Sequence, residues 1–263
     1  MATEVEEHVN VHTHGGIALI RFNRPDKMNA IGALTRKQLG DAIKQAERDD
    51  AVRVVVLTGG GRAFSSGADV TEMVGDGGMR TAEDVGNVLR NEYMPMLTRL
   101  RTMPKPVIAA MNGPAVGIGA SFALACDIRI ATPDAYILEA FVNIGLAPDG
   151  GVSWLLPRLA GTGVAYEMFF TGKPLSAPDA HRLGVINRLV PAERLEQEVR
   201  DLATQLASQP RQALAGAKRA VNHALTSTYE DAMEFESYLQ EAQAGSQEFA
   251  DGVRAFLDRR SKK

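Results

Sequence analysis

Apolar and polar positions along the chain follow two periods, one typical of strands and one typical of helices. Residues 52–58 form an apolar run, as in a strand that is buried on both faces of a sheet. Residues 35–49 carry apolar side chains at helical spacing, and Thr35 with Gln38 has the spacing of a capping box. We therefore expect an amphipathic helix opened by Thr35 and followed by a buried strand.

Similar patterns predict the other elements. Glycine-rich, polar residues 74–80 predict a loop, whose place beside a glycine turn suggests a lid over substrate. The helical pattern over residues 81–100 continues across Pro95, where we expect a kink. Further strands are expected at residues 17–22, 107–111, 128–131 and 136–142, and a helix of small residues at 117–125.

The pattern predicts mainly helices in the last part of the chain. From Gly151 onward the pattern is mostly helical, Ser176 has the position of an N-cap, and Pro191, Pro210 and Ser246 can each open another helix. Strands that alternate with helices, followed by helices only, predict an α/β core over residues 1–209 and a helical region over residues 210–263.

Composition narrows the class of protein. The chain has 263 residues and a formal net charge of −3, so it lacks the excess of positive charge that is typical of nucleic-acid-binding proteins. No apolar run reaches the roughly 18 residues of a membrane span, and the first residues are acidic where a signal peptide would be basic, so we expect a cytoplasmic protein without a membrane partner. Cys126 is the single cysteine, which excludes an internal disulfide and argues against a thiolate metal site.

Two glycine-rich turns carry the candidate chemistry. Phe64-Ser65-Ser66-Gly67-Ala68-Asp69-Val70 and Asn112-Gly113-Pro114-Ala115-Val116-Gly117-Ile118-Gly119-Ala120 each follow a predicted strand. Both lead toward a helix start, where backbone N–H groups lack helical partners, and glycine lets such a backbone approach a ligand closely. Two converging N–H groups can form an oxyanion hole, which stabilises a thioester oxygen as it gains negative charge.

These turns, with other motifs in the same order, resemble those of the crotonases, the enoyl-CoA hydratase/isomerase superfamily. The other motifs are Arg24-Pro25-Asp26-Lys27-Met28-Asn29-Ala30, Ala125-Cys126-Asp127-Ile128-Arg129, Gly145-Leu146-Ala147-Pro148-Asp149-Gly150-Gly151 and Leu183-Gly184-Val185-Ile186-Asn187-Arg188-Leu189-Val190. The resemblance implies a ClpP-like spiral of β-β-α units whose C-terminal helices form a homotrimer or a dimer of trimers. It also implies an acyl-CoA or enoyl-CoA substrate, in which coenzyme A arrives as part of the substrate and no separate cofactor is needed.

The resemblance assigns roles to individual residues. The backbone N–H groups of Ala68 and Ile118 are the implied oxyanion donors, and the Ile118 side chain must turn away from the thioester because many relatives have glycine there. Asp69 matches a position used around coenzyme A, although it could equally cap the short helix that it opens. Arg24 and Lys27 are expected to bind phosphates, residues Ala30, Ala68, Val70 and Thr71 to line the coenzyme A groove, and Phe256 and Arg259 to close that groove from a neighbouring subunit.

The carboxylates decide the expected reaction. Relatives that hydrate enoyl-CoA use two glutamates, and the matching positions here are Ser121 and Phe141, neither of which can transfer a proton to carbon. The segment that contains Asp149 is similar to oxepin-forming isomerases of phenylacetate degradation and to Δ3,Δ2-enoyl-CoA isomerases, whose catalytic aspartate lies where Asp149 does. The resemblance therefore favours an isomerase. Asp149 precedes a predicted helix, so it could instead serve as an N-cap.

Glu139 is a second acid near this segment. Strand alternation over residues 136–142 predicts that Glu139 and Phe141 share the face directed toward the site. Glu139 could then be a second catalytic acid or a structural residue held in an ion pair, and we favour the ion pair.

Three alternative functions stay open from the sequence. Family membership alone allows an enoyl-CoA hydratase. A CoA-thioester hydrolase is a second alternative, because Gly119-Ala120-Ser121-Phe122-Ala123 approaches the nucleophile-elbow pattern, although its last position is alanine and the candidate bases, His181 and His223, lie in predicted surface helices. A non-enzymatic crotonase that binds RNA or acts as a scaffold is the third alternative.

Overall fold

A computed structural model of the chain describes residues 6–75, 78–79 and 81–261. Its core is a six-stranded sheet in the order β1-β2-β3-β6-β8-β11, in which only β1 and β2 pair antiparallel and the other neighbours run parallel. The strands are β1 (Val9–His14), β2 (Ile17–Phe22), β3 (Val54–Gly59), β6 (Val107–Met111), β8 (Ile128–Ala131) and β11 (Arg188–Leu189).

Helices cover both faces of this sheet. All six residues of β3 are buried, and its side chains alternate between two apolar clusters. Val55 and Leu57 pack in the cluster that includes side chains of α1 (Ala33–Arg48), α3 (Met94–Thr102) and α4 (Ile118–Ala125). Val54 and Val56 pack in the cluster that includes α8 (Leu195–Ala207). The apolar run therefore forms a central strand, as expected of a parallel sheet buried on both faces.

The start of α1 differs from the prediction. The helix begins at Ala33 after the N-cap Gly32, so Thr35 lies inside it and does not cap it. The Thr35 hydroxyl is 3.0 Å from Nδ1 of His8, and the Gln38 amide oxygen accepts from the backbone N–H of His8 at 2.8 Å. Gln38 also accepts from the N–H of Val9 at 3.1 Å, so both polar side chains tie the helix to the segment where β1 begins, which the pattern did not predict.

The helical segment after Thr81 contains an irregular turn. Thr81 and Asp84 form a capping box at the start of α2 (Ala82–Val88), and a π-helical turn, Leu89–Tyr93, connects α2 to α3. Pro95 lies in the first turn of α3. Proline has no N–H and clashes with the preceding turn, so the wider π turn accommodates it without ending the helix.

A second, smaller sheet lies beside the core. It has the order β10-β9-β7, from β7 (Ala115–Val116), β9 (Tyr136–Leu138) and β10 (Leu175–Ser176). β9 is shorter than predicted, because the chain leaves the strand after Leu138 and forms a 3-10 turn, Phe141–Ile144. Helices α5 (Val152–Ala160), α6 (Thr162–Thr171) and α7 (Ala177–Arg182) follow, and Ser176 caps α7 as predicted.

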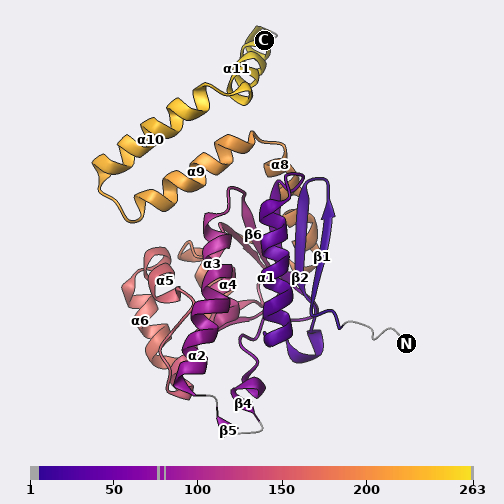
Figure 1. Ribbon diagram of the computed structural model, residues 1–263, viewed down its shortest axis with the longest axis vertical. Helices are drawn as coiled ribbons and strands as arrows, with labels where there is room; N and C mark the ends of the chain where they lie inside the picture. The colour runs from indigo at the N-terminus through magenta and orange to yellow at the C-terminus, as the bar shows by residue number, and fades with distance from the viewer. Residues whose placement is uncertain (1–5, 76–77, 80, 262–263) are drawn as a thin grey trace.

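The described part of the chain ends in three helices, α9 (Arg211–Ala224), α10 (Tyr229–Ala244) and α11 (Gln247–Ser261). Figure 1 shows α9 and α10 as a hairpin beside the core, with α11 at the end farthest from the short strands β4 (Val74–Gly75) and β5 (Gly78–Met79). β4 and β5 pair antiparallel within the expected lid, and the rest of that lid lies outside the described residues. The division at residues 209 and 210 stays a prediction.

None of the helices in the described ranges is long and apolar enough to cross a membrane.

Candidate active site

The two glycine turns meet at the carboxyl ends of β3 and β6. The Val116 N–H donates to the Ser65 carbonyl oxygen at 2.9 Å, and Ser65 pairs with Ala115 in an isolated bridge. Gly67 has φ +91°, and a Cβ placed on it would lie 2.7 Å from the Val116 carbonyl oxygen and 3.8 Å from the Ile118 nitrogen. Only glycine allows this approach, which places the turns against each other.

The predicted oxyanion donors lie at this junction. Gly117 has φ +51° and donates to the Leu138 carbonyl oxygen at 2.8 Å, which leaves Ile118 as the first residue of α4. The N–H groups of Ala68 and Ile118 have no acceptor among the described residues. Both residues line one cavity of about 290 Å³. The cavity thus contains two backbone donors from adjacent turns, which suits a developing oxyanion.

The Ile118 side chain is buried and directed toward the Asp149-Gly150 turn. A Cβ placed on Gly150, which has φ +62°, would lie 2.7 Å from Cδ1 of Ile118 and 2.4 Å from Oγ of Ser121. The turn therefore packs closely against α4. This packing fixes the main chain at Asp149 beside the glycine turn that contains Ile118.

Asp149 lines the same cavity. Its side chain does not cap α5, because the N-cap is Gly151 and no side chain caps that helix. The alternative interpretation of Asp149 as an N-cap is therefore wrong. Its Oδ1 atom is buried and has no hydrogen-bond partner among the described residues, and burial raises the pKa of this carboxyl to about 6. A carboxyl with such a pKa can take up and release a proton near neutral pH.

The environment of Glu139 contradicts two expectations. Its side chain is fully buried and does not line the cavity, whereas Phe141 does, so the two do not share a face. The strand alternation fails because β9 ends at Leu138. The favoured ion pair is also wrong, since neither carboxyl oxygen of Glu139 has a partner among the described residues. Burial and the charge of Asp149 hold the pKa of Glu139 well above its usual range.

Ser121 is buried in α4. Its hydroxyl lies 3.4 Å from the carbonyl oxygens of Gly117 and Asp149. Histidine does not contact Ser121 in the described ranges: Nδ1 of His181 lies 3.0 Å from the Ile186 carbonyl oxygen, and His223 stacks on Phe235. This arrangement lacks the serine–histidine contact on which a nucleophilic hydrolase depends.

The helical segment of residues 82–93 supplies a wall that the sequence analysis missed. Val85, Val88, Leu89 and Tyr93 all line the cavity, at the spacing of one helical face. Tyr93 is 4% exposed, and burial raises its pKa to about 12, so its phenol stays neutral. The helical spacing of these residues is the signal that could have identified the wall.

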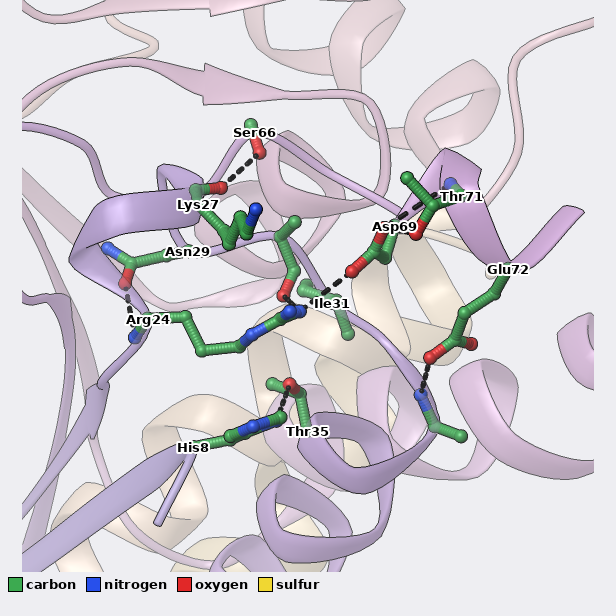
Figure 2. Close-up of polar contacts among 12 residues, drawn as sticks. His8, Arg24, Lys27, Asn29, Ile31, Thr35, Ser66, Asp69, Thr71 and Glu72 are labelled. Atoms are coloured by element: carbon green, nitrogen blue, oxygen red, sulfur yellow. Dashed lines mark hydrogen bonds and ion pairs between the residues drawn. The ribbon is translucent and has the colours of Figure 1, made fainter. Parts of the chain in front are cut away.

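The expected coenzyme A segment is held by an ion pair (Figure 2). Nη1 of Arg24 lies 2.8 Å from Oδ2 of Asp69 and also donates to the Ala30 carbonyl oxygen. Asp69 accepts from the Thr71 hydroxyl at 2.6 Å, and these bonds from Thr71 and Arg24 lower its pKa. Asp69 therefore does cap the 3-10 turn Val70–Met73, and the Arg24 guanidinium is bound to a carboxylate.

Other predicted coenzyme A residues occupy different surroundings. Lys27 and Thr71 are exposed, and Val70 lines the cavity although 60% of it is exposed. Phe256 and Arg259 lie on the exposed α11 and do not line the cavity of their own chain. Their predicted role would require a neighbouring subunit. The coenzyme A assignments all stay predictions.

Groups of three or more histidine, cysteine, aspartate or glutamate side chains that could hold a metal ion do not occur in residues 6–75, 78–79 and 81–261.

Known proteins resemble this chain over nearly its whole length. The family described as enoyl-CoA hydratase/isomerase matches residues 12–263. The chain is 39% identical to the 1,2-epoxyphenylacetyl-CoA isomerase of Escherichia coli (strain K12), over 97% of each chain. It is 40% identical to a probable enoyl-CoA hydratase of Rhodobacter capsulatus, over 93% of each chain. The crystal structure of an enoyl-CoA hydratase from Bacillus anthracis matches with a TM-score of 0.91 at 29% identity, over 96% of this chain and 97% of the other.

Proposed function

The chain belongs to the enoyl-CoA hydratase/isomerase family, the crotonases, and we propose that it works as an isomerase of enoyl-CoA esters with Asp149 as its acid–base group. One observation carries the proposal. Among the described residues, three carboxyls line the cavity, and two of them are ion-paired, Asp69 with Arg24 and Glu72 with Arg36. Asp149 is the third, and one of its oxygens has no partner among the described residues.

A single carboxylate is sufficient for the isomerisation. Asp149 removes a proton from the α-carbon of a 3-enoyl-CoA, and the electron pair delocalises onto the thioester oxygen. The N–H groups of Ala68 and Ile118 stabilise that oxygen while the dienolate exists. Asp149 then returns the same proton at the γ-carbon, and the double bond lies between the α- and β-carbons. The atoms balance, and coenzyme A takes part only as the thioester of the substrate.

Hydration needs a second acid–base group, and neither residue at the two glutamate positions of the hydratases can serve as one. Water addition uses one acid–base group to activate water and another to protonate the α-carbon, and each contributes about 10²- to 10⁴-fold. Ser121 is buried against main-chain carbonyls, and Phe141 has no proton to transfer. We therefore expect slow hydration beside fast isomerisation.

The cavity favours an apolar acyl group. Its wall includes Val85, Val88, Leu89, Phe141 and Ile144, which suit a hydrocarbon chain or a carbon ring. The E. coli relative is named as an isomerase of 1,2-epoxyphenylacetyl-CoA, so a ring-derived epoxide belongs among the substrates to be tried. The coenzyme A moiety would lie along Ala30 and residues 68–71, near Lys27.

We further propose that the protein assembles as a homotrimer or a dimer of trimers. Exposed apolar side chains on α10 and α11, among them Tyr229, Phe249 and Phe256, support an assembly through these helices. Phe256 and Arg259 would then close the coenzyme A groove of a neighbour.

Product analysis tests the proposed reaction. The protein is incubated separately with a 3-enoyl-CoA, a 2-enoyl-CoA and 1,2-epoxyphenylacetyl-CoA, and products are followed by mass and ultraviolet absorbance. We expect isomers of unchanged mass from the first or the third substrate. Rapid addition of water to 2-enoyl-CoA would instead establish a hydratase. Absence of turnover across the panel would favour the non-enzymatic alternative.

A further inference from the structure

A second cavity lies on the face of the core sheet opposite the candidate active site. It has a volume of about 450 Å³, and its lining comes mainly from β1, β2, β3 and α8. Residues of β2 alternate between the two faces: Ala18 and Ile20 pack in the apolar cluster that includes α4, whereas Leu19 packs against the cluster that includes α8. A ligand in this cavity would therefore be separated from Asp149 by the sheet.

Most of this cavity is apolar. α8 packs mainly over β3 and β6, so Val56 on β3 is 2% exposed, whereas Ile17 and Leu19 on β2 are only partly buried. The cavity lies where this cover ends, toward the sheet edge formed by β1. Its apolar lining comes from two strands and from one face of α8. The residues are Ile17, Leu19, Val56, Leu195, Val199 and Ala203.

One cation lies at the end of the apolar lining. Arg21 follows Leu19 by two residues on the same face of β2 and lines the cavity. Its Nε atom is buried, and its side chain has no hydrogen-bond or ion-pair partner in the described ranges. Its cross-strand neighbours do not supply one: Oδ1 of Asn10 is also unpartnered there, and the Thr58 hydroxyl donates to the Ala110 carbonyl oxygen at 2.8 Å. A buried N–H without an acceptor is unfavourable, so Arg21 is available to a ligand.

The other charged groups of the lining do not neutralise Arg21. Arg200 and Glu196 form an ion pair with each other at 2.6 Å. His12 and His14 line the cavity from the exposed strand β1. Among the described residues, the lining therefore carries one uncompensated positive charge, which lies at one end of an apolar surface.

We propose that this cavity binds an apolar monocarboxylate, such as a fatty acid or an aryl-substituted acetate. The carboxylate would bind the Arg21 guanidinium, whose paired N–H groups match its two oxygens. The apolar tail would lie over Leu19 and Ile17 beneath α8. Four strand residues from Arg21 to Ile17 span about 13 Å, which accommodates a chain of several carbons or a phenyl ring. An inorganic anion would leave this apolar surface uncovered.

Calorimetric titration of the full chain tests the ligand class. Decanoate and phenylacetate are titrated beside the alcohols of matched shape, 1-decanol and 2-phenylethanol, and beside acetate. We expect at least one of the two acids to bind saturably, and its matched alcohol and acetate to bind at least about ten-fold more weakly. If neither acid binds, or if the alcohol or acetate binds as tightly as the acid, the proposal is overturned.

Substitutions of Arg21 locate the binding. Arg21→Met should weaken binding of the acid by about ten- to a hundred-fold, because the charge-assisted hydrogen bonds are lost. Arg21→Lys keeps the charge without the fork and should have intermediate affinity. Arg182→Met, at an exposed position outside the cavity, is the control and should bind as the wild type does. Equal affinity in the wild type, Arg21→Lys and Arg21→Met would place the acid elsewhere and overturn the proposal.

Sedimentation and turnover of Arg21→Met complete the test. We expect the mass and the turnover of the wild type, because Arg21 lies outside the candidate active site. A changed mass would show that this face is an interface between copies of the chain, which would overturn the ligand site. The titrations do not use turnover, so their failure leaves the proposed isomerase function unaffected.

Discussion

At the scale of single residues, the Asp149 carboxyl lies in a largely apolar cavity wall, and burial raises its pKa from 3.8 to about 6. The folded protein therefore binds this proton more tightly than the unfolded chain does. The stability that the protonated group contributes is fully present below pH 3.8 and is lost as the pH rises through about 6. At neutral pH the group required for the proposed chemistry is thus unfavourable for folding.

Asp149→Asn should separate these two effects. We expect loss of isomerase turnover by at least about 10²-fold, because the amide cannot accept the α-proton. The same variant should be more stable than the wild type at pH 8 by about 1–3 kcal/mol and nearly equal to it at pH 4. Urea unfolding at the two pH values measures the difference, with the exposed Asp134→Asn as control. Retained turnover, or a stability difference that does not change with pH, would contradict this account.

Residue identities near Asp149 were easier to predict than their environments. The ordered motif identified Asp149, but it did not reveal that the backbone of Gly151 at φ +84° takes the N-cap position. Glu139 was misjudged for a related reason. The side chain leaves the strand pattern because β9 ends at Leu138, and local alternation does not encode that end.

At the scale of elements, the close contact between the two glycine turns leads to a prediction about activity. Gly67→Ala adds a Cβ 2.7 Å from the Val116 carbonyl oxygen and should push the turns apart. We expect a loss in kcat of about 10²-fold, comparable to losing one oxyanion donor. Gly15→Ala is a matched control, because Gly15 also has positive φ, at +58°, but its added Cβ meets no atom within 4 Å. Equal losses of activity in the two variants would exclude a role for turn contact.

The attachment of α9 to the core also depends on a few polar contacts. Nζ of Lys218 donates to Oδ2 of Asp127 at 2.8 Å and to the carbonyl oxygens of Leu100 and Lys105. Asp127 additionally accepts from the Val107 N–H at 2.8 Å, at the start of β6. One lysine therefore joins the helical region to the sheet and to the loop before it.

Lys218→Met should weaken this attachment. It leaves partly buried acceptors without a donor, and we expect a loss of about 1–3 kcal/mol in the free energy of unfolding. Lys37→Met is the matched control, because it removes an ion pair with Asp41 whose side chains are both mostly exposed, and should cost less than about 0.5 kcal/mol. Urea denaturation measures both. Similar losses in the two variants would show that the Lys218 contacts have no special role.

The bounds of the predicted elements matched best where burial is continuous, and polar residues account for two of the misses. β6 and β8 have the predicted bounds, since their side chains are almost entirely apolar and buried. β1 escaped prediction because its sequence VNVHTH is polar and four of its six residues are exposed. Polar residues also caused the wrong prediction for the start of α1, because Thr35 and Gln38 contact His8, just before β1, and do not cap the helix.

At the scale of the whole molecule, the crotonase fold expected from the ordered motifs is confirmed. The family match covers residues 12–263, and the B. anthracis hydratase structure has the same fold. Several motifs in fixed order specify the arrangement of the whole chain, which no single turn could do. The chain alone does not reveal what its C-terminal helices contact, because their apolar residues could pack on the chain itself or on another copy. In the structure they remain exposed.

That exposure leads to the last prediction, which concerns assembly. Phe249, Val253, Phe256 and Leu257 recur at helical spacing on α11, and each is more than 40% exposed, with Leu257 at 57%. An apolar stripe of this kind stabilises a protein when a partner covers it. We expect sedimentation at three or six times the 28.3 kDa mass of the chain. Phe249→Asp with Leu257→Asp should shift the protein toward monomer, and Arg259→Ala should keep the assembly while it weakens binding of coenzyme A esters. Sedimentation of the wild type as a monomer with full activity at low concentration would refute both the assembly and the shared site.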